Sequence, residues 1–203
     1  MKKILHLVFA IVCISLLACS KEATDSSGSK EDLNENSIIT LDNGVMIEKT
    51  DGYYVVRFPE TRASSAMEIH VKEDYLYTKD HLWVDFKGIS IGRYKIGIAP
   101  LLARFMDNLC YIELYTGEEF KQNEIFGYLE NPAQGVYLPM PWNGTVMETN
   151  PDLRDSPELI TTNPYEEWMV ILFLYNFDYW TNLNDNGLLD AAHYAIYAAR
   201  CLN

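Results

Sequence analysis

The residues with the most evident chemistry form the segment Gly88-Ile89-Ser90-Ile91-Gly92. A Gly-x-Ser-x-Gly segment is typical of a nucleophile elbow, in which a sharp turn exposes a serine at the start of a helix. An aspartate, Asp178 or Asp190, and then His193 follow in the chain order that a Ser-Asp-His triad of this kind requires. A secreted serine hydrolase that uses Ser90 is therefore one hypothesis for the function.

The residues after Ser90 weaken that hypothesis. Gly92 and Gly97 interrupt the segment in which the elbow needs a helix, and glycine disfavours helix interiors. We therefore predict a glycine-flanked strand around Ser90 and assign no catalytic residue, which makes a non-catalytic protein the main expectation.

A second pattern, near the C-terminus, has the spacing of a helix–loop–helix calcium site. Asn182, Asn184 and Asn186 take the first three ligand positions, and Asp190 takes a later one. The twelfth position, where a bidentate carboxylate belongs, is His193. Because Asp190 is the only carboxylate among these positions, we favour an asparagine-rich turn over a metal site and expect no metal.

Two of the four cysteines remain once the N-terminal segment is set aside, namely Cys110 and Cys201. They either form one disulfide or remain as two buried thiols. The chain has no Cys-x-x-Cys motif and no Cys/His cluster, so no zinc site is predicted. We expect no cofactor.

The first residues indicate targeting rather than chemistry. Lys2 and Lys3 precede an apolar stretch over 4–17, which is shorter than the roughly 20 residues of a membrane span. The stretch ends in Leu16-Leu17-Ala18-Cys19, which resembles the lipobox of bacterial lipoproteins. The resemblance implies a signal peptide over 1–18 and a lipid-bearing Cys19 that anchors the chain to a membrane.

The residues after Cys19 refine that location. Residues 20–32 are polar and predict a flexible tether, which we extend over 19–36. Ser20 is similar to the residue that sorts lipoproteins to the outer membrane. Lys21-Glu22 resembles, in part, the signal that exports Bacteroidota-type lipoproteins to the cell surface. The resemblance thus implies an outer-membrane lipoprotein, with surface exposure as a further option. It extends over about the first 25 residues, and we recognise no family for the remaining domain.

Composition limits the partners. The full chain has a net charge of −13, and without Lys2 and Lys3 it has 14 basic and 29 acidic residues, a net charge of −15. Such a chain repels phosphate backbones, which excludes nucleic acid as a partner. Fourteen tyrosines and four tryptophans favour packing in strands, with sugar stacking as the alternative.

Hydrophobic patterning predicts strands before helices. Strands are expected over 37–47, 53–58, 82–86 and 109–115, with a hairpin turn at Asp51-Gly52. Helices are expected over 101–106, 116–130, 163–180 and 188–202, and a long loop over 133–156. This order predicts the α+β class, as one domain over 37–203 with an N-terminal antiparallel β-rich part and C-terminal helices.

The function expected from these features is that of a membrane-anchored lipoprotein that serves as a binding or accessory module. Its partners would be the membrane, through Cys19, and a glycan or a protein. Besides the hydrolase, an inhibitor or immunity-type protein is a further alternative. The apolar loop tip within 135–142 would then insert into another protein's cleft.

Overall fold

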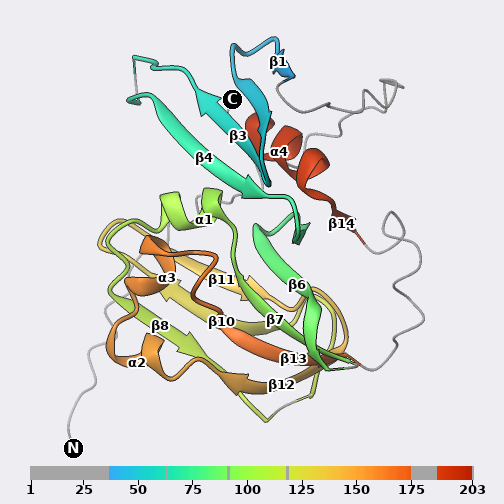
Figure 1. Cartoon of the computed structure of the whole chain (residues 1–203). Helices are drawn as coiled ribbons and strands as arrows, with labels where there is room; N and C mark the ends of the chain where they lie inside the picture. The colour runs from blue at the N-terminus through green and yellow to red at the C-terminus, as the bar shows by residue number, and fades with distance from the viewer. Residues whose placement is uncertain (1–36, 63, 91, 118, 175–186, 203) are drawn as a thin grey trace, which may run out of the picture.

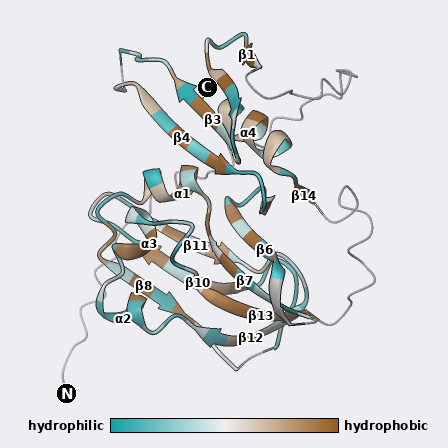
Figure 2. Cartoon of the chain, in the orientation of Figure 1, coloured by the Kyte–Doolittle hydropathy of each residue, from teal (hydrophilic) through white to brown (hydrophobic). Residues whose placement is uncertain are grey.

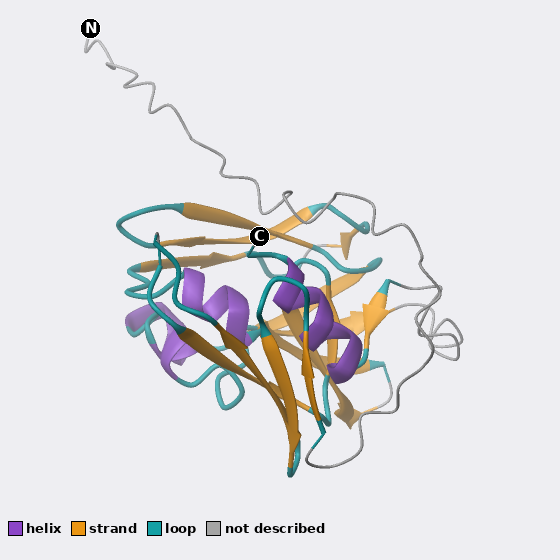
Figure 3. Cartoon of the chain, turned by 90° about the horizontal axis from the view of Figure 1, so that it is seen from above, coloured by secondary structure: helices purple, strands orange, loops and turns teal. Residues whose placement is uncertain are grey.

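The computed structural model describes residues 37–62, 64–90, 92–117, 119–174 and 187–202. Within these residues, strands far outweigh helices, and the strands pair in three antiparallel sheets (Figures 1 and 3). No helix among the described residues is long and apolar enough to cross a membrane.

An amino-terminal sheet comes first. Its strand order is the order of the chain: β1 (Ile38–Thr40), β2 (Met46–Thr50), β3 (Tyr53–Phe58) and β4 (Met67–Lys72). The predicted hairpin turn at Gly52 is confirmed, with a φ of 75° that glycine adopts without strain. The single strand predicted over 37–47 is instead a hairpin, because the chain turns at Gly44, where φ is 79°.

Two further sheets contain the remaining strands. The three-stranded sheet has the order β11 (Gly135–Pro139), β10 (Ile125–Glu130) and β8 (Tyr111–Leu114). The seven-stranded sheet has the order β14 (Leu188–Leu189), β5 (Leu76–Thr78), β6 (Leu82–Ser90), β7 (Arg93–Ile98), β13 (Val170–Leu174), β12 (Gly144–Thr149) and β9 (Glu119–Phe120).

The helices are short. Helix α1 (Pro100–Phe105) lies where a helix was predicted, with Pro100 in its first turn. Helices α2 (Asp152–Asp155) and α3 (Leu159–Thr162) are single turns. The C-terminal helix α4 (Ala191–Arg200) is shorter than predicted, and its N-cap is Asp190, whose side chain accepts a hydrogen bond from the backbone N–H of His193.

Two apolar clusters form the core. One packs the inner faces of the seven-stranded and three-stranded sheets together, with Ile96, Phe126 and Leu172 fully buried. The other joins the amino-terminal sheet to α4, with Trp83 and Tyr194 at its centre. Figure 2 shows hydrophobic residues along β13 and on β3 and β4, strands that contribute to these two clusters.

Two of the predicted helices and the predicted long loop are wrong. The segment 116–130 contains β9 and β10, and 163–180 contains β13. The loop predicted over 133–156 contains β11, β12 and α2. The run Val-Ile-Leu-Phe-Leu of β13 is apolar on both faces, and such a run has no period that separates a buried strand from a buried helix. Strands thus continue almost to the C-terminus, and the architecture is compatible with the α+β class but richer in strands than predicted.

Candidate functional site

Ser90 does not occupy a nucleophile elbow. It ends strand β6 and pairs with Arg93 at the start of β7, so a hairpin follows it where the elbow requires a helix. Gly92, in the turn of that hairpin, has a φ of 80°. The glycines of the motif therefore serve a strand reversal.

The predicted base, His193, is engaged elsewhere. Its ring nitrogen Nδ1 lies 2.8 Å from Oδ1 of Asp190, within the first turn of α4. Helix α4 packs near Trp83 at the start of β6, and Ser90 is seven residues farther along that strand. At about 3.3 Å per residue, this separates Ser90 from Trp83 by roughly 20 Å. Ser90 thus lies at the opposite end of β6 from the residue that packs in the same cluster as α4, the helix that contains His193.

The candidate calcium ligands Asn182, Asn184 and Asn186 lie outside the described residues. The fourth, Asp190, caps α4. Among the residues that the structure describes, no three His, Cys, Asp or Glu side chains form a group that could hold a metal ion. Cys19, the predicted lipidation site, also lies outside the described residues and stays a prediction.

Of the two alternatives for Cys110 and Cys201, the bond between them is not present in the structure, because Cys110 is a free thiol, and it is exposed rather than buried. The Cys110 thiol donates a hydrogen bond of 3.4 Å to the carbonyl oxygen of Glu130, across the three-stranded sheet. Cys201 follows α4, which packs on the amino-terminal sheet. The two cysteines thus belong to different parts of the fold.

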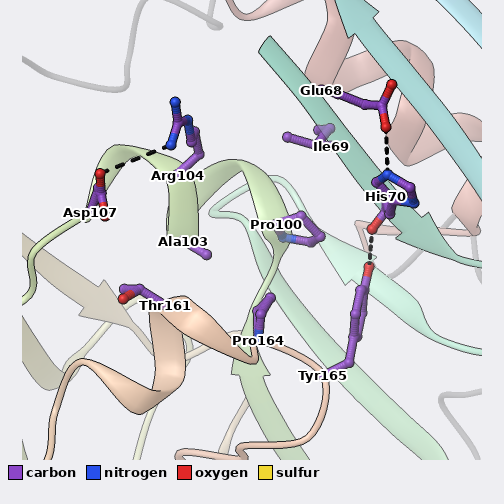
Figure 4. Close-up of a pocket in the computed structure, with 10 residues that line it drawn as sticks. All are labelled: Glu68, Ile69, His70, Pro100, Ala103, Arg104, Asp107, Thr161, Pro164 and Tyr165. Atoms are coloured by element: carbon purple, nitrogen blue, oxygen red, sulfur yellow. Dashed lines mark hydrogen bonds and ion pairs between the residues drawn. The ribbon is translucent and has the colours of Figure 1, made fainter.

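One open pocket of about 320 Å³ lies where the amino-terminal sheet meets α1 and α3 (Figure 4). Strand β4 contributes Glu68, Ile69 and His70 to one wall. The opposite wall and floor come from the two short helices and the segments after them: Pro100, Ala103, Arg104, Asp107, Thr161, Pro164 and Tyr165.

The charged groups of this pocket largely satisfy one another. Glu68 accepts hydrogen bonds from Arg57 Nε at 2.8 Å and pairs with His70 Nε2 at 2.7 Å. The His70 contact, followed by Arg57, lowers the pKa of Glu68. Arg104 lies 3.9 Å from Asp107, which is too far for a hydrogen bond. No two described side chains of the pocket are arranged as a nucleophile and a base. The pocket is therefore a polar depression without a catalytic pair.

Tyr165 fixes one end of the pocket. Its hydroxyl accepts a hydrogen bond from the backbone N–H of Lys72 at 2.9 Å and donates to the carbonyl oxygen of His70 at 3.1 Å. These two groups lie on β4, the edge strand of the amino-terminal sheet. The Tyr165 hydroxyl thus satisfies edge groups that would otherwise be unpaired. Burial raises the pKa of Tyr165 well above its usual range.

Side-chain hydrogen bonds hold the turn between β10 and β11. The Asn131 side-chain oxygen accepts hydrogen bonds from the backbone N–H groups of Ala133 and Gln134, at 3.0 and 2.9 Å. Its amide nitrogen donates to the carbonyl oxygens of Phe105 and Asp107, at the end of α1. The sequence reads Asn-Pro-Ala-Gln here, and its turn-forming residues could have indicated a hairpin.

Comparison with known proteins assigns this architecture. Residues 75–197 match the family model described as glycine cleavage H-protein. A probable glycine cleavage system H protein of Thermococcus gammatolerans is 36% identical over 133 residues, which cover 64% of this chain and 93% of the relative. The glycine cleavage system H protein of Bacillus subtilis is 36% identical over 104 residues, which cover 50% of this chain and 80% of the relative.

A solved structure agrees with the sequence match. The crystal structure of a glycine cleavage system H protein from Mycobacterium marinum aligns with a TM-score of 0.50 and 25% identity. The alignment covers 62% of this chain and 96% of that chain. Strands β1 to β4, over 38–72, precede the segment that matches the family model.

These findings correct the predicted function. The roles of a lipid-anchored binding module, of a serine hydrolase using Ser90 and of an inhibitor are wrong, because the matching relatives are glycine cleavage system H proteins. The outer-membrane or cell-surface location and the membrane and glycan partners are wrong for the same reason. The predicted anchor and location depended on about 25 N-terminal residues, which carry no information about the domain that follows them.

The family signal was missed because it is spread over many strand positions rather than concentrated in a short motif. The match runs from β5 into α4 and includes strands that the hydrophobic pattern assigned to helices. With more than half of its length in the family model, and with a relative covered almost completely, the chain belongs to the glycine cleavage H-protein family.

Proposed function

We propose that this chain is an H-protein-type docking component of a glycine cleavage system, which binds the enzymes of that system without carrying a covalent arm. The retained fold supports the first half of the proposal, since the alignment covers 93% of one relative and 96% of one solved structure. The distribution of lysines supports the second half.

The family implies a lipoyl group, which a protein carries as an amide on a lysine ε-amine. An arm that must enter the sites of other proteins needs a lysine whose backbone is held rigidly and whose surroundings leave it free. The turn of a long hairpin meets both conditions, because paired strands fix its backbone while the turn side chains project. Whether this chain could carry the lipoyl group therefore depends on the positions of its lysines. The matched segment contains four: Lys79, Lys87, Lys95 and Lys121.

Two of these lysines lie in strands. Lys87 forms an ion pair of 2.7 Å with Asp74. Lys95 lies within β7, paired to neighbours on both sides, with its ammonium group 5.7 Å from the ring centre of Trp168. Neither position projects from a turn.

The other two lysines lie in exposed turns that other segments of the chain contact. The turn of Lys79 adjoins α4, whose Tyr197 hydroxyl donates a hydrogen bond of 3.1 Å to the Lys79 carbonyl oxygen. Lys121 follows the two-residue strand β9, and the next residue, Gln122, is bonded through its N–H to the side chain of Asn143. Both turns are therefore flanked by other segments of the chain.

Among the described strands of the matched segment, the long hairpins β6–β7 and β10–β11 contain no lysine between their strands. The sequence between β6 and β7 is Ile-Gly, and the sequence between β10 and β11, over 131–134, is Asn-Pro-Ala-Gln. In the latter, Asn131 and Gln134 are committed to hydrogen bonds with the end of α1. The residues present do not fit a lipoyl carrier, and we derive no step through that group.

A protein that docks like an H-protein but carries no arm should inhibit the reaction competitively. The test is a reconstituted bacterial glycine cleavage system that contains its P, T and L enzymes and the Bacillus subtilis H protein, with this chain added in increasing amounts. We expect the rate to fall and to recover when more H protein is added. An acidic protein of unrelated fold and similar net charge is the control. An unchanged rate, or turnover supported by this chain in place of the H protein, would contradict the proposal.

A further inference from the structure

The outer face of the three-stranded sheet carries exposed aromatic and acidic side chains, which we call the tyrosine–glutamate face. Strand alternation creates it, because Leu129 and Leu138 point into the core while their neighbours point outward. In the register of the sheet, Tyr128 lies between Tyr137 and Glu113. The members of the face are Tyr111, Glu113, Tyr115, Tyr128, Glu130 and Tyr137.

The tyrosines form a continuous stripe rather than scattered exposed residues. Tyr137 is 53% exposed and Tyr111 is 46% exposed. Tyr128 lies between them, with its ring centre 4.9 Å from that of Tyr137 and 6.4 Å from that of Tyr111. Gly135 makes room for this arrangement, since a Cβ there would lie 2.0 Å from the Tyr128 hydroxyl. A contiguous exposed aromatic surface of this kind is characteristic of a protein interface.

The negative charge of the face favours a partner with positively charged side chains. Glu113 and Glu130 place carboxylates among the rings, and the Glu113 carboxylate raises the pKa of Tyr115. No member of the face is basic, and the chain as a whole has a net charge of −13. Aromatic rings attract guanidinium and ammonium groups through their faces, and carboxylates bind the same groups through charge-assisted hydrogen bonds.

We propose that the tyrosine–glutamate face is a docking surface for a protein that presents arginine and lysine side chains. The inference rests on the proposed function and specifies where a glycine cleavage enzyme binds. Nucleic acid and anionic membranes are excluded as occupants by the negative charge of the face. A basic protein surface would place its cations over Tyr111 and Tyr137 and pair them with the two glutamates.

The experiment compares two variants in the reconstituted glycine cleavage assay. Tyr111→Ser/Tyr137→Ser removes exposed rings, and Glu113→Lys/Glu130→Lys reverses the charge of the face. We expect each to weaken inhibition at least about tenfold, because each variant alters two central members of the face and a few anchor residues dominate the binding energy of an interface. We also expect inhibition by the unaltered chain to weaken as salt is raised. Circular dichroism establishes that the variants are folded.

Matched changes on the amino-terminal sheet are the controls. Met46→Ser alters a side chain that is 40% exposed on β2, and Glu60→Lys reverses an exposed charge after β3. Both should inhibit like the unaltered chain. If the unaltered chain inhibits and the face variants inhibit equally well, the docking surface is wrong while the proposed function stands. If the unaltered chain does not inhibit at all, both are overturned.

Discussion

The hydroxyl groups of Tyr77 and Tyr165 lie 2.8 Å apart and join the amino-terminal sheet to the H-protein fold. Tyr77 lies on β5, at the start of the segment that matches the family, and its hydroxyl also donates to the Lys72 carbonyl oxygen at 2.8 Å. Tyr165 bonds two further backbone groups of β4. The pair thus anchors a sheet that precedes the matched segment.

Replacing Tyr165 should show how strong this attachment is. Tyr165→Phe removes the hydrogen bonds to the part-buried Lys72 N–H and to the exposed His70 carbonyl, and a hydrogen bond within a protein contributes about 0.5–1.5 kcal/mol. We expect the free energy of unfolding in urea to fall by about that amount. Tyr137→Phe, which removes a hydroxyl from a 53% exposed side chain, is the control and should change stability by less than about 0.5 kcal/mol. Equal stability of both variants would show that the Tyr165 contacts contribute nothing.

Acid should destabilise the fold through His81. This side chain is 1% exposed, its Nδ1 lies 2.9 Å from the Tyr194 hydroxyl, and burial lowers its pKa to about 4. The ordinary pKa of histidine, about 6.5, applies to the unfolded chain. As the pH falls below about 6.5, the unfolded state therefore takes up a proton that the folded state refuses until about pH 4. The expected loss is about 3 kcal/mol across this window.

The variant His81→Asn isolates this contribution. The φ of residue 81 is 59°, a left-handed conformation that asparagine tolerates well, so the substitution removes the titration without adding backbone strain. The neighbouring Asp80, whose pKa is raised by burial, is present in both proteins and cancels in the comparison. Urea unfolding between pH 7 and pH 4 should show a smaller loss of stability in the variant. Parallel curves would rule out the role of His81.

Close packing at Gly97 should make it intolerant of a side chain. A Cβ at this position would lie 2.3 Å from Cζ2 of Trp83, which is buried and hydrogen-bonded through Nε1 to the Pro164 carbonyl oxygen. Overpacking of this kind costs about 1–3 kcal/mol, and we expect Gly97→Ala to lower the melting temperature accordingly. The matched control is Gly135→Ala, where the obstructing atom is the outer end of the half-exposed Tyr128, which can move aside. A smaller effect at Gly97 than at Gly135 would refute the packing argument.

Local signals predicted only part of this fold. The turn at Gly52 and the start of α1 at Pro100 could be predicted from the sequence, because the backbone preferences of glycine and proline are local. Strand β10 was not, because the spacing of Thr116 and Glu119 imitates a helix cap and the burial of Phe126 and Leu129 depends on sheets that come together only in the fold. Tertiary packing overrode the local pattern there.

The candidate site was less predictable still. Glu68 and Arg104 approach one pocket from segments that lie far apart in the chain, and no spacing rule relates them. The same holds for the link between Tyr77 and Tyr165, which are 88 residues apart. The tyrosine–glutamate face, by contrast, was visible only as a surplus of tyrosine, because the strand register that aligns the rings requires β10 to be identified as a strand.

Whether this chain carries a lipoyl arm can be measured by its intact mass after exposure to a bacterial lipoylation system. The Bacillus subtilis H protein, treated in parallel, is the positive control. We expect the control to gain the mass of a lipoyl group while this chain keeps its unmodified mass. A chain that gains that mass, and loses the gain in Lys79→Arg or Lys121→Arg, would contradict the claim that this protein docks without an arm.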